Sequence, residues 1–87
     1  MAIDTKRDQA LVERYIAVDP FRGRADARMK ERGVHVWAVI AHLRGTDWDV
    51  SEAMRAYGLT PEMVEAAEAF YRLNRAYIDA RLLLNSD

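Results

Sequence analysis

The sequence contains no cysteine and only two histidines, which restricts the chemistry that its side chains can perform. Without thiols, the chain cannot form disulfide bonds, thiolate metal sites or cysteine nucleophiles. His35 and His42 are seven residues apart, whereas metal ligands on a helix are usually three or four apart and need a third ligand. Asp47 and Asp49 follow His42 closely, but their spacing does not match a metal site. We therefore expect no metal, no cofactor and no catalytic residue, and a protein that is not an enzyme.

Long apolar runs are also missing, and no stretch approaches the roughly 20 residues that a membrane-spanning helix needs. The first eight residues carry charge and precede no apolar segment, so they do not resemble a signal peptide. An absence of disulfides is compatible with a reducing compartment. We expect a cytoplasmic protein with no membrane partner.

Two prolines and four glycines are few for 87 residues, and no linker divides the chain. This length is enough for one small domain, which we place over residues 1–87. Within it we distinguish a basic arm, residues 14–36, from a helical region, residues 37–84. A core of this size is limited, so association of copies is a common source of further stability.

The most informative segment encodes two helices joined by a tight turn. Asp49 and Glu52 have the spacing of a capping box. Gly58 stands where a helix ends in a left-handed residue, and Thr60 then caps a new helix. Pro61 occupies the first position of that helix, where its missing N–H is not needed. So short a turn makes the two helices cross steeply, as in a helix-turn-helix motif.

Other helices and extended pieces are predicted around this motif. Residues 5–15 have the pattern of a short helix, and residues 15–18 favour an extended strand that Asp19-Pro20 ends as a turn. A second extended piece is expected at residues 34–36. A buried helix follows and ends at Gly45; its apolar residues at helical spacing are Trp37, Val39, Ile40 and Leu43. We expect Trp37 and also Trp48 to be core anchors.

The last helix is predicted to be long, because nothing interrupts it between Pro61 and Asn85. About 24 residues would span roughly 36 Å. Its apolar residues follow a heptad rhythm: Ala66, Phe70, Leu73, Tyr77, Ala80 and Leu84. We expect Tyr77 to pack in the core and Tyr71 to stay exposed. The second half of the helix extends beyond a small core, so its apolar stripe is expected to meet a second copy or a partner, unless it folds back on its own N-terminal arm.

Charge is unevenly distributed although the formal net charge is −1. Residues 1–44 hold nine Lys and Arg against six Asp and Glu, and residues 45–87 hold four against eight. The basic half is therefore not the half that carries the helix-turn-helix. If DNA is bound, the charge would come from the arm and its neighbours; the candidate DNA-binding residues are Arg22, Arg24, Arg28, Lys30, Arg32, Arg55 and Thr60, with Arg44 a further source of charge.

The order of these motifs resembles a bacterial family, the domain of unknown function numbered 433, which includes VapB-type antitoxin-like proteins. That family's pattern opens with Tyr-Ile and Asp-Pro, continues with a Gly-rich basic arm ending in Ile-Pro-Val-Trp, and has Leu-Thr-Pro-Glu before its last helix. The matching residues here are Tyr15-Ile16, Asp19-Pro20, Gly23-Arg24, Val34-His35-Val36-Trp37, Ser51-Glu52, Leu59-Thr60-Pro61-Glu62 and Ile78-Asp79-Ala80-Arg81. The family's Gly-Thr-Arg is Glu31-Arg32-Gly33 in this chain. The resemblance implies a homeodomain-like helical fold, a dimer, and frequent pairing with a PIN-like nuclease toxin.

The charges of the last helix favour a protein partner over DNA. Glu62, Glu65 and Glu68 form a stripe at i, i+3 spacing, and such a stripe opposes a phosphate backbone. It suits a basic nuclease, which it would attract electrostatically. Glu62 also has a simpler role, since an acid in the first turn favours the helix dipole. The candidate residues for a partner or dimer interface are Glu62, Glu65, Phe70, Leu73, Tyr77 and Leu84.

Together these observations predict an all-α, homeodomain-like helix-turn-helix domain with a short β-prone N-terminal arm and a long C-terminal helix. The predicted function is a non-enzymatic, antitoxin-like regulator, a homodimer that binds a PIN-like nuclease toxin and also operator DNA through the arm. One alternative is a helix-turn-helix transcription regulator. Another is a small dimeric accessory protein with no role on DNA.

Overall fold

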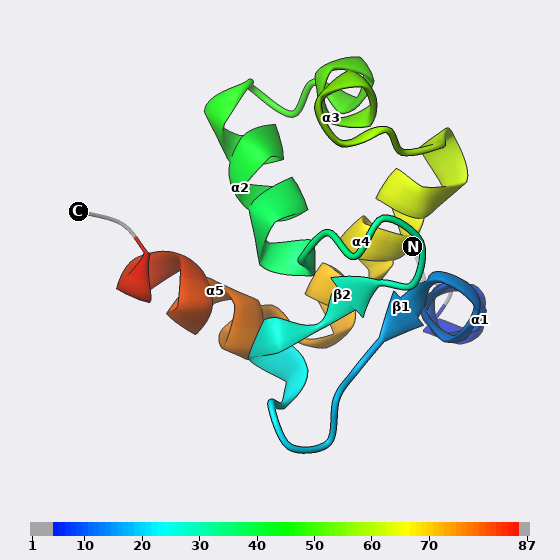
Figure 1. Cartoon of the computed structure of the whole chain (residues 1–87), viewed down its shortest axis with the longest axis vertical. Coiled ribbons are helices and arrows are strands. Elements are labelled where there is room, and N and C mark those ends of the chain that lie inside the picture. The colour runs from blue at the N-terminus through cyan, green and yellow to red at the C-terminus, as the bar shows by residue number, and fades with distance from the viewer. Residues whose placement is uncertain (1–4, 86–87) are drawn as a thin grey trace.

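The computed structural model describes residues 5–85, and this part of the chain is mostly helical with one small hairpin (Figure 1). In chain order its elements are α1 (Thr5–Tyr15), β1 (Ile16–Ala17), the 3₁₀ turn η1 (Arg24–Asp26), β2 (Arg28–Met29), α2 (Val36–Gly45), α3 (Val50–Tyr57), α4 (Pro61–Leu73) and α5 (Arg75–Leu84). The radius of gyration is 12.1 Å, close to the roughly 12 Å expected for a compact domain of this length. No helix in residues 5–85 has the length and apolar character to cross a membrane.

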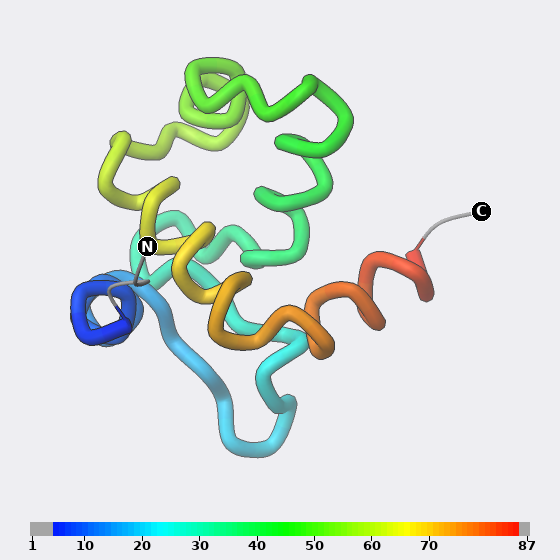
Figure 2. Tube along the Cα trace, turned by 180° about the vertical axis from the view of Figure 1, so that it is seen from behind, coloured from blue at the N-terminus to red at the C-terminus, as the bar shows by residue number. Residues whose placement is uncertain are grey.

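Helix α4 is the centre of the domain. Figures 1 and 2 show α1 on one side of it and α5 turning away at its end, with α2 and α3 above. Seven of its thirteen residues are buried: Met63, Val64, Ala66, Ala67, Ala69, Phe70 and Tyr71. Small alanines on this helix allow α1 and α2 to approach it closely, and the largest fully buried side chains from other elements include Met29, Ile40, Leu43 and Ile78.

The predicted start and end of α3 and the predicted start of α4 are confirmed. The Asp49 carboxylate accepts a hydrogen bond from the Glu52 N–H at 3.1 Å, while the Glu52 side chain pairs with Arg55 and does not complete the capping box. Gly58 is left-handed, with φ 67° and ψ 40°, and ends α3. Thr60 Oγ1 accepts from the Met63 N–H at 3.2 Å, at the residue before Pro61.

The prediction of one continuous last helix is wrong. The helix stops at Asn74, whose φ of −136° and ψ of 38° leave the helical region. The Asn74 side-chain amide donates to the Phe70 carbonyl at 3.2 Å and so satisfies one of the carbonyls that the break exposes. After the break, α5 packs against α2 and η1, and Ile78 becomes fully buried. The second half of the predicted helix therefore folds back on the arm.

The arm is a short antiparallel hairpin. Ile16 pairs with Met29 and Ala17 with Arg28, and a single bridge joins Arg28 to His35. The Asp19-Pro20 turn is confirmed, because the Asp19 carboxylate accepts from the Phe21 N–H at 2.8 Å. Val36 already begins α2, so the extended piece expected at residues 34–36 is shorter than predicted.

Three aromatic residues are placed differently from the sequence-based expectation. Trp48 is not a core anchor: it follows Asp47 in left-handed backbone (φ 57° and 64°), is 41% exposed, and donates its indole N–H to Glu68 at 3.0 Å. Tyr71 is buried at 6% exposure, whereas Tyr77 is 49% exposed, the reverse of the expectation. The folding back of α5 explains the reversal: Tyr71 donates its hydroxyl to Asp79 of α5 and lies against Arg44 of α2, while Tyr77 lies outside the core beside Arg24 of the arm. Trp37 packs partly buried against the core.

Candidate binding surfaces

The acidic stripe of α4 is exposed, but each of its carboxylates is held by a neighbouring element. Tyr15 from α1 donates its hydroxyl to Glu62 at 2.6 Å, and this hydrogen bond raises the pKa of Tyr15. Glu65 pairs with Arg7 of α1 at 2.7 Å, and Glu68 accepts from Trp48. The three carboxylates are therefore a row with fixed positions, and the half-exposed pairs add little to stability themselves.

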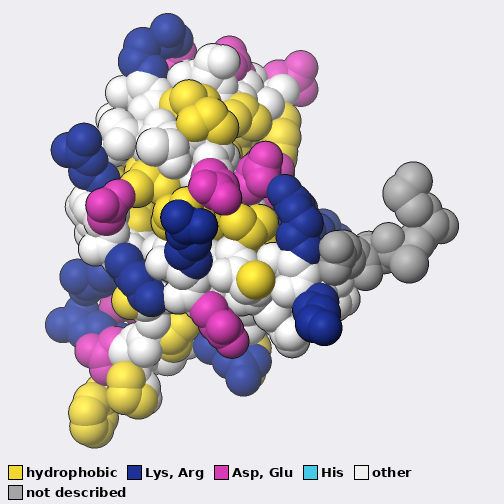
Figure 3. All heavy atoms as spheres, turned by 90° about the vertical axis from the view of Figure 1, so that its right-hand side faces the viewer, with side chains coloured by type: hydrophobic (Ala, Val, Ile, Leu, Met, Phe, Trp, Pro, Cys, Tyr) yellow, Lys and Arg dark blue, Asp and Glu magenta, His cyan; other side chains and the backbone are white. Residues whose placement is uncertain are grey.

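The same geometry leaves α4 little surface with which to read a DNA groove. A recognition helix places the side chains of its first turns in the major groove. Here the first turns offer Thr60, Pro61, Glu62 and Glu65, because the other residues of these turns are buried in the core. On the face that includes α1, Figure 3 shows basic and acidic side chains interspersed, with no broad patch of positive charge.

The predicted DNA-binding residues separate into two groups. The first lies beside the turn between α3 and α4. The guanidinium of Arg32 is next to Gly58, 3.4 Å from where a Cβ on that glycine would lie. Lys30 and Thr60 line one surface hollow together with Arg14 and Glu62. Arg55 is near in sequence to this turn, although its side chain pairs with Glu52.

The second group surrounds Asp26, the last residue of η1 in the arm, which is only 8% exposed. Four cationic or titratable groups surround its carboxylate: His35 Nε2 at 3.1 Å, Arg22 at 3.5 Å, Arg81 at 3.6 Å and Arg28 at 3.7 Å. Burial raises the pKa of Asp26, but His35 and the three arginines outweigh burial and hold the pKa below its usual range. Arg22, Arg28 and His35 belong to the arm itself, so the pair with Arg81 joins the arm to α5, and these arginines are not spread over a free basic face.

Arg24 belongs to the same region and joins the arm to the start of α5. Its guanidinium donates to the Asn74 side-chain oxygen at 3.3 Å and lies 5.2 Å from the centre of the Tyr77 ring. The arm hairpin and the helix break at Asn74 thus stabilise each other.

Of the predicted interface residues, Phe70 lies in the core, with only 2% exposure, and is not available to a partner. Leu73, Tyr77 and Leu84 are exposed to 37%, 49% and 82%. The sequence reasoning missed Phe21, which is 98% exposed at the tip of the arm loop. Its signal is the Asp-Pro turn, which places the next residue at a protruding tip.

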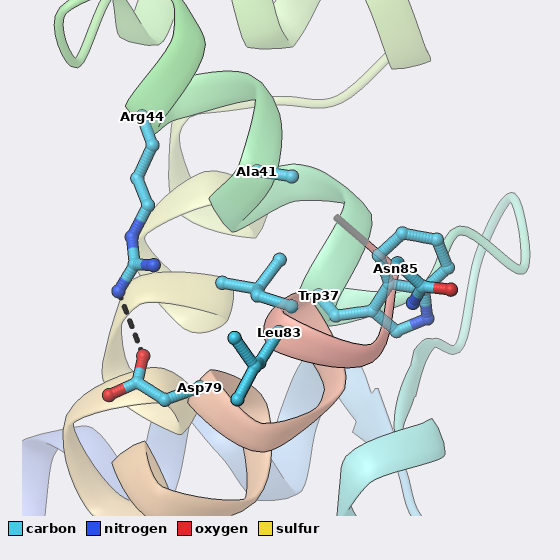
Figure 4. A pocket seen from close by; sticks show the side chains of 7 residues that line it. Trp37, Ala41, Arg44, Asp79, Leu83 and Asn85 are labelled. Carbon is cyan, nitrogen blue, oxygen red and sulfur yellow. Dashed lines mark hydrogen bonds and ion pairs between the residues drawn. The ribbon is translucent and has the colours of Figure 1, made fainter. Parts of the chain in front are cut away.

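An open groove of about 440 Å³ lies between α2 and α5 (Figure 4). Its lining is apolar at the centre and polar at one end: Trp37, Ala41, Leu82, Leu83, Asn85, and the pair Arg44–Asp79 at 2.8 Å. Asp79 also accepts from the Tyr71 hydroxyl at 2.7 Å, and this bond together with Arg44 lowers the pKa of Asp79. The groove exists only because α5 folds back over α2, so the sequence reasoning could not anticipate it.

The histidines and nearby acids do not gather at one point. His35 contacts Asp26, whereas His42 lies edge-on to Tyr57 with ring centres 5.5 Å apart. Throughout residues 5–85, no three His, Asp or Glu side chains are grouped so that they could hold a metal ion. Comparison of the chain with models of protein families, with curated proteins and with solved structures finds no match in any of the three.

Proposed function

We propose that this chain is a non-enzymatic, antitoxin-like regulator with a homeodomain-like helix-turn-helix fold, whose main partner is a protein. The order of its sequence motifs supports this proposal. The succession of α3, a three-residue turn (Gly58, Leu59 and Thr60) and α4 also supports it. We further propose that it acts as a homodimer and that its partner is a nuclease of the PIN-like class.

The row of three fixed carboxylates on α4 carries the proposal. Residues three apart rise about 4.5 Å along a helix, so Glu62, Glu65 and Glu68 place three negative charges within about 9 Å. Tyr15, Arg7 and Trp48 hold these side chains before any partner arrives. A partner therefore meets a preordered row, and less side-chain entropy is lost on binding.

The chemistry of the row indicates a basic partner surface. A nuclease presents cationic side chains where its nucleic acid substrate binds, and these side chains are complementary to a row of carboxylates. Such complementarity raises the association rate and selects the partner, with a strong dependence on ionic strength. Covering that surface would block access of the substrate, as expected for an antitoxin.

The test is binding of the full chain to a purified PIN-like nuclease, followed by surface plasmon resonance at two salt concentrations. We expect Glu62→Lys with Glu65→Lys to lower the association rate at least tenfold at low salt. Glu13→Lys, at an exposed position of α1, serves as the matched charge reversal and should change the rate less than threefold. Equal rates for the parent chain and the double variant would refute the role of the row.

A second candidate function is DNA binding through the α3–α4 turn, and the position of Arg32 against Gly58 favours it. Lys30 and Arg32 bring positive charge from the arm to the start of α4, although the sequence placed the two features in different halves. Two phosphate contacts predict a slope of roughly −2 in a plot of log K against log salt concentration for each chain. Fluorescence anisotropy on duplex DNA tests this function: Lys30→Glu with Arg32→Glu should abolish the slope, and a flat response in the parent would exclude it. A homodimer that binds neither the nuclease nor DNA would favour the third alternative, a small accessory protein with no role on DNA.

A further inference from the structure

Phe21 is the most exposed large apolar side chain in residues 5–85. It stands at the tip of a loop that two bonds fix: the Asp19 carboxylate accepts from the Phe21 N–H at 2.8 Å, and the Asp19 carbonyl accepts from the Gly23 N–H at 2.8 Å. The protruding loop is seen at the bottom of Figure 1. Because these bonds hold the backbone that presents the exposed ring, less backbone entropy is lost when a complementary surface covers it, which is a property of an interface anchor.

The groove between α2 and α5 offers such a surface. Leu82 and Leu83 of α5 line it together with Ala41 and Trp37 of α2, and Figure 4 shows Leu83 on the helix that faces α2. The indole Nε1 of Trp37 is buried with no hydrogen-bond partner among the described residues. An apolar groove of this width accepts an aromatic ring in preference to a charged group.

Helix α5 fixes the relation between the exposed ring and the groove. Arg24, three residues after Phe21, stacks on Tyr77 in the first turn of α5. The groove is lined by Leu82 and Leu83 from the last turn. A helix of ten residues is about 15 Å long, so the ring and the groove flank opposite ends of α5.

We propose that two copies of this chain pair around a two-fold axis with their α5 helices antiparallel, so that Phe21 of each copy enters the α2–α5 groove of the other. In an antiparallel pair, the first turn of one α5, which lies next to the arm, is beside the last turn of the other α5, which lines the groove. The two-fold symmetry then forms two equivalent contacts between Phe21 and a groove. The inference rests on the homodimer of the proposed function and supplies its geometry.

Charge supports a second copy as the occupant. Arg22, next to the ring, would reach the C-terminal end of the other α5, where the last carbonyls carry partial negative charge. The ion pair of Arg22 with Asp26 is long, at 3.5 Å, and its side chain is 61% exposed, so the guanidinium is able to turn toward this site. The formal net charge of −1 per chain opposes association little.

The distribution of exposed apolar residues supports the same occupant. Seven large hydrophobic side chains are exposed in residues 5–85, and six of them belong to the arm loop, the end of α4 or α5: Val18, Phe21, Leu73, Tyr77, Leu83 and Leu84. A stable interface covers about 800 Å² on each partner, roughly a seventh of this chain's 5700 Å² surface. The arm loop and α5 together supply a continuous region that such an interface requires.

Crosslinking tests the geometry directly, because the native chain has no cysteine. One chain carries Arg22→Cys, which keeps the Phe21 ring beside the new thiol, a second chain of different mass carries Ala41→Cys, and the mixture is treated with a short bis-maleimide. We expect the mixed 22–41 product to exceed both same-chain products at least fivefold. A chain with Ala56→Cys, at an exposed position of α3, replaces the Ala41→Cys chain as control and should give no mixed product.

Sedimentation equilibrium provides the second measurement, and it separates the interface from the fold. Phe21→Ala and Ala41→Trp, which fills the groove, should each raise the dimer dissociation constant at least tenfold, while Ala56→Trp leaves it unchanged. Circular dichroism confirms that each variant is folded. A parent chain that stays monomeric at all concentrations overturns the proposed dimer. If the dimer dissociation constant changes in neither variant, the Phe21 contact is overturned. The proposed function is then unaffected, because the nuclease-binding experiment tests it independently.

Discussion

Ile78 is the one residue of α5 that is fully buried, so its truncation tests whether α5 folds back as described. Ile78→Ala removes three carbon groups from the contact of α5 with the rest of the core. At about 0.8 kcal/mol for each buried methylene, the transfer term alone is roughly 2.4 kcal/mol. The unfilled cavity adds to this, and we expect the free energy of unfolding to fall by about 3 kcal/mol.

That loss is large for a domain of this length. A chain of 87 residues has a free energy of unfolding of roughly 4–13 kcal/mol. Urea unfolding followed by circular dichroism at 222 nm measures the change. Fluorescence provides a second reading, because Trp37 lines the groove beside α5 and reports undocking of α5 before the whole domain unfolds. In a Trp48→Phe background, Trp37 is the only indole.

Leu84 is the matched control, since it lies on the same helix but is 82% exposed. Leu84→Ala should change the free energy of unfolding by less than about 0.5 kcal/mol when measured at a concentration where the chain is monomeric. A loss below about 1 kcal/mol for Ile78→Ala, or equal losses for the two variants, would contradict the docking of α5. It would favour the continuous last helix that the sequence predicts.

Three other variants test the ion pair of α1 and the two helix ends. Arg72 donates two hydrogen bonds to the buried Asp8, at 2.9 and 3.0 Å, and they hold the pKa of Asp8 below its usual range. Asp8→Asn should lower the free energy of unfolding by about 2 kcal/mol. This value is reduced because Arg72 is 40% exposed and solvent screens its charge. Since the folded pKa is depressed, this stabilisation is present above the unfolded value of about 3.9 and is lost as the pH falls below it, so the urea midpoint of the parent should drop more steeply on acidification than that of the variant. Gly58→Ala should destabilise the domain by about 1–2 kcal/mol in thermal unfolding, because the backbone of Gly58 is left-handed. Gly45→Ala should not destabilise the domain, because Gly45 lies in α2 with open space around its Cβ position. Equal effects of the two variants would refute the backbone argument. Thr60→Ala should cost about 1 kcal/mol in urea unfolding and Thr60→Ser much less, because only alanine removes the hydroxyl that caps α4.

Sequence reasoning located the features whose cause is local. Gly58, Thr60 and Pro61 act within one or two turns of their own helix, so their roles could be read from spacing alone. The Asp19-Pro20 turn belongs to the same class. The break at Asn74 could not be read in this way, because asparagine is tolerated inside helices and what decides here is the packing of Ile78 on elements distant in sequence.

The candidate surfaces show the same division between local and distant causes. The spacing of Glu62, Glu65 and Glu68 predicted their common stripe, but the groups that fix them come from α1 and from the loop before α3. The groove between α2 and α5 has no signature in the sequence, because it depends on the helix break. Trp48 was misjudged since large aromatic residues are usually buried, whereas a left-handed loop turns this indole outward.

The bond between Asp8 and Arg72 has a consequence for how the chain folds. It joins residues 64 positions apart, and α1 has its most extensive packing along α4. During synthesis, α1 leaves the ribosome first but has nothing to dock on until α4 has followed. Hydrogen exchange in α1 should therefore become slow only after the rest of the core has assembled, and the rate of folding should depend on this closure of the chain on itself.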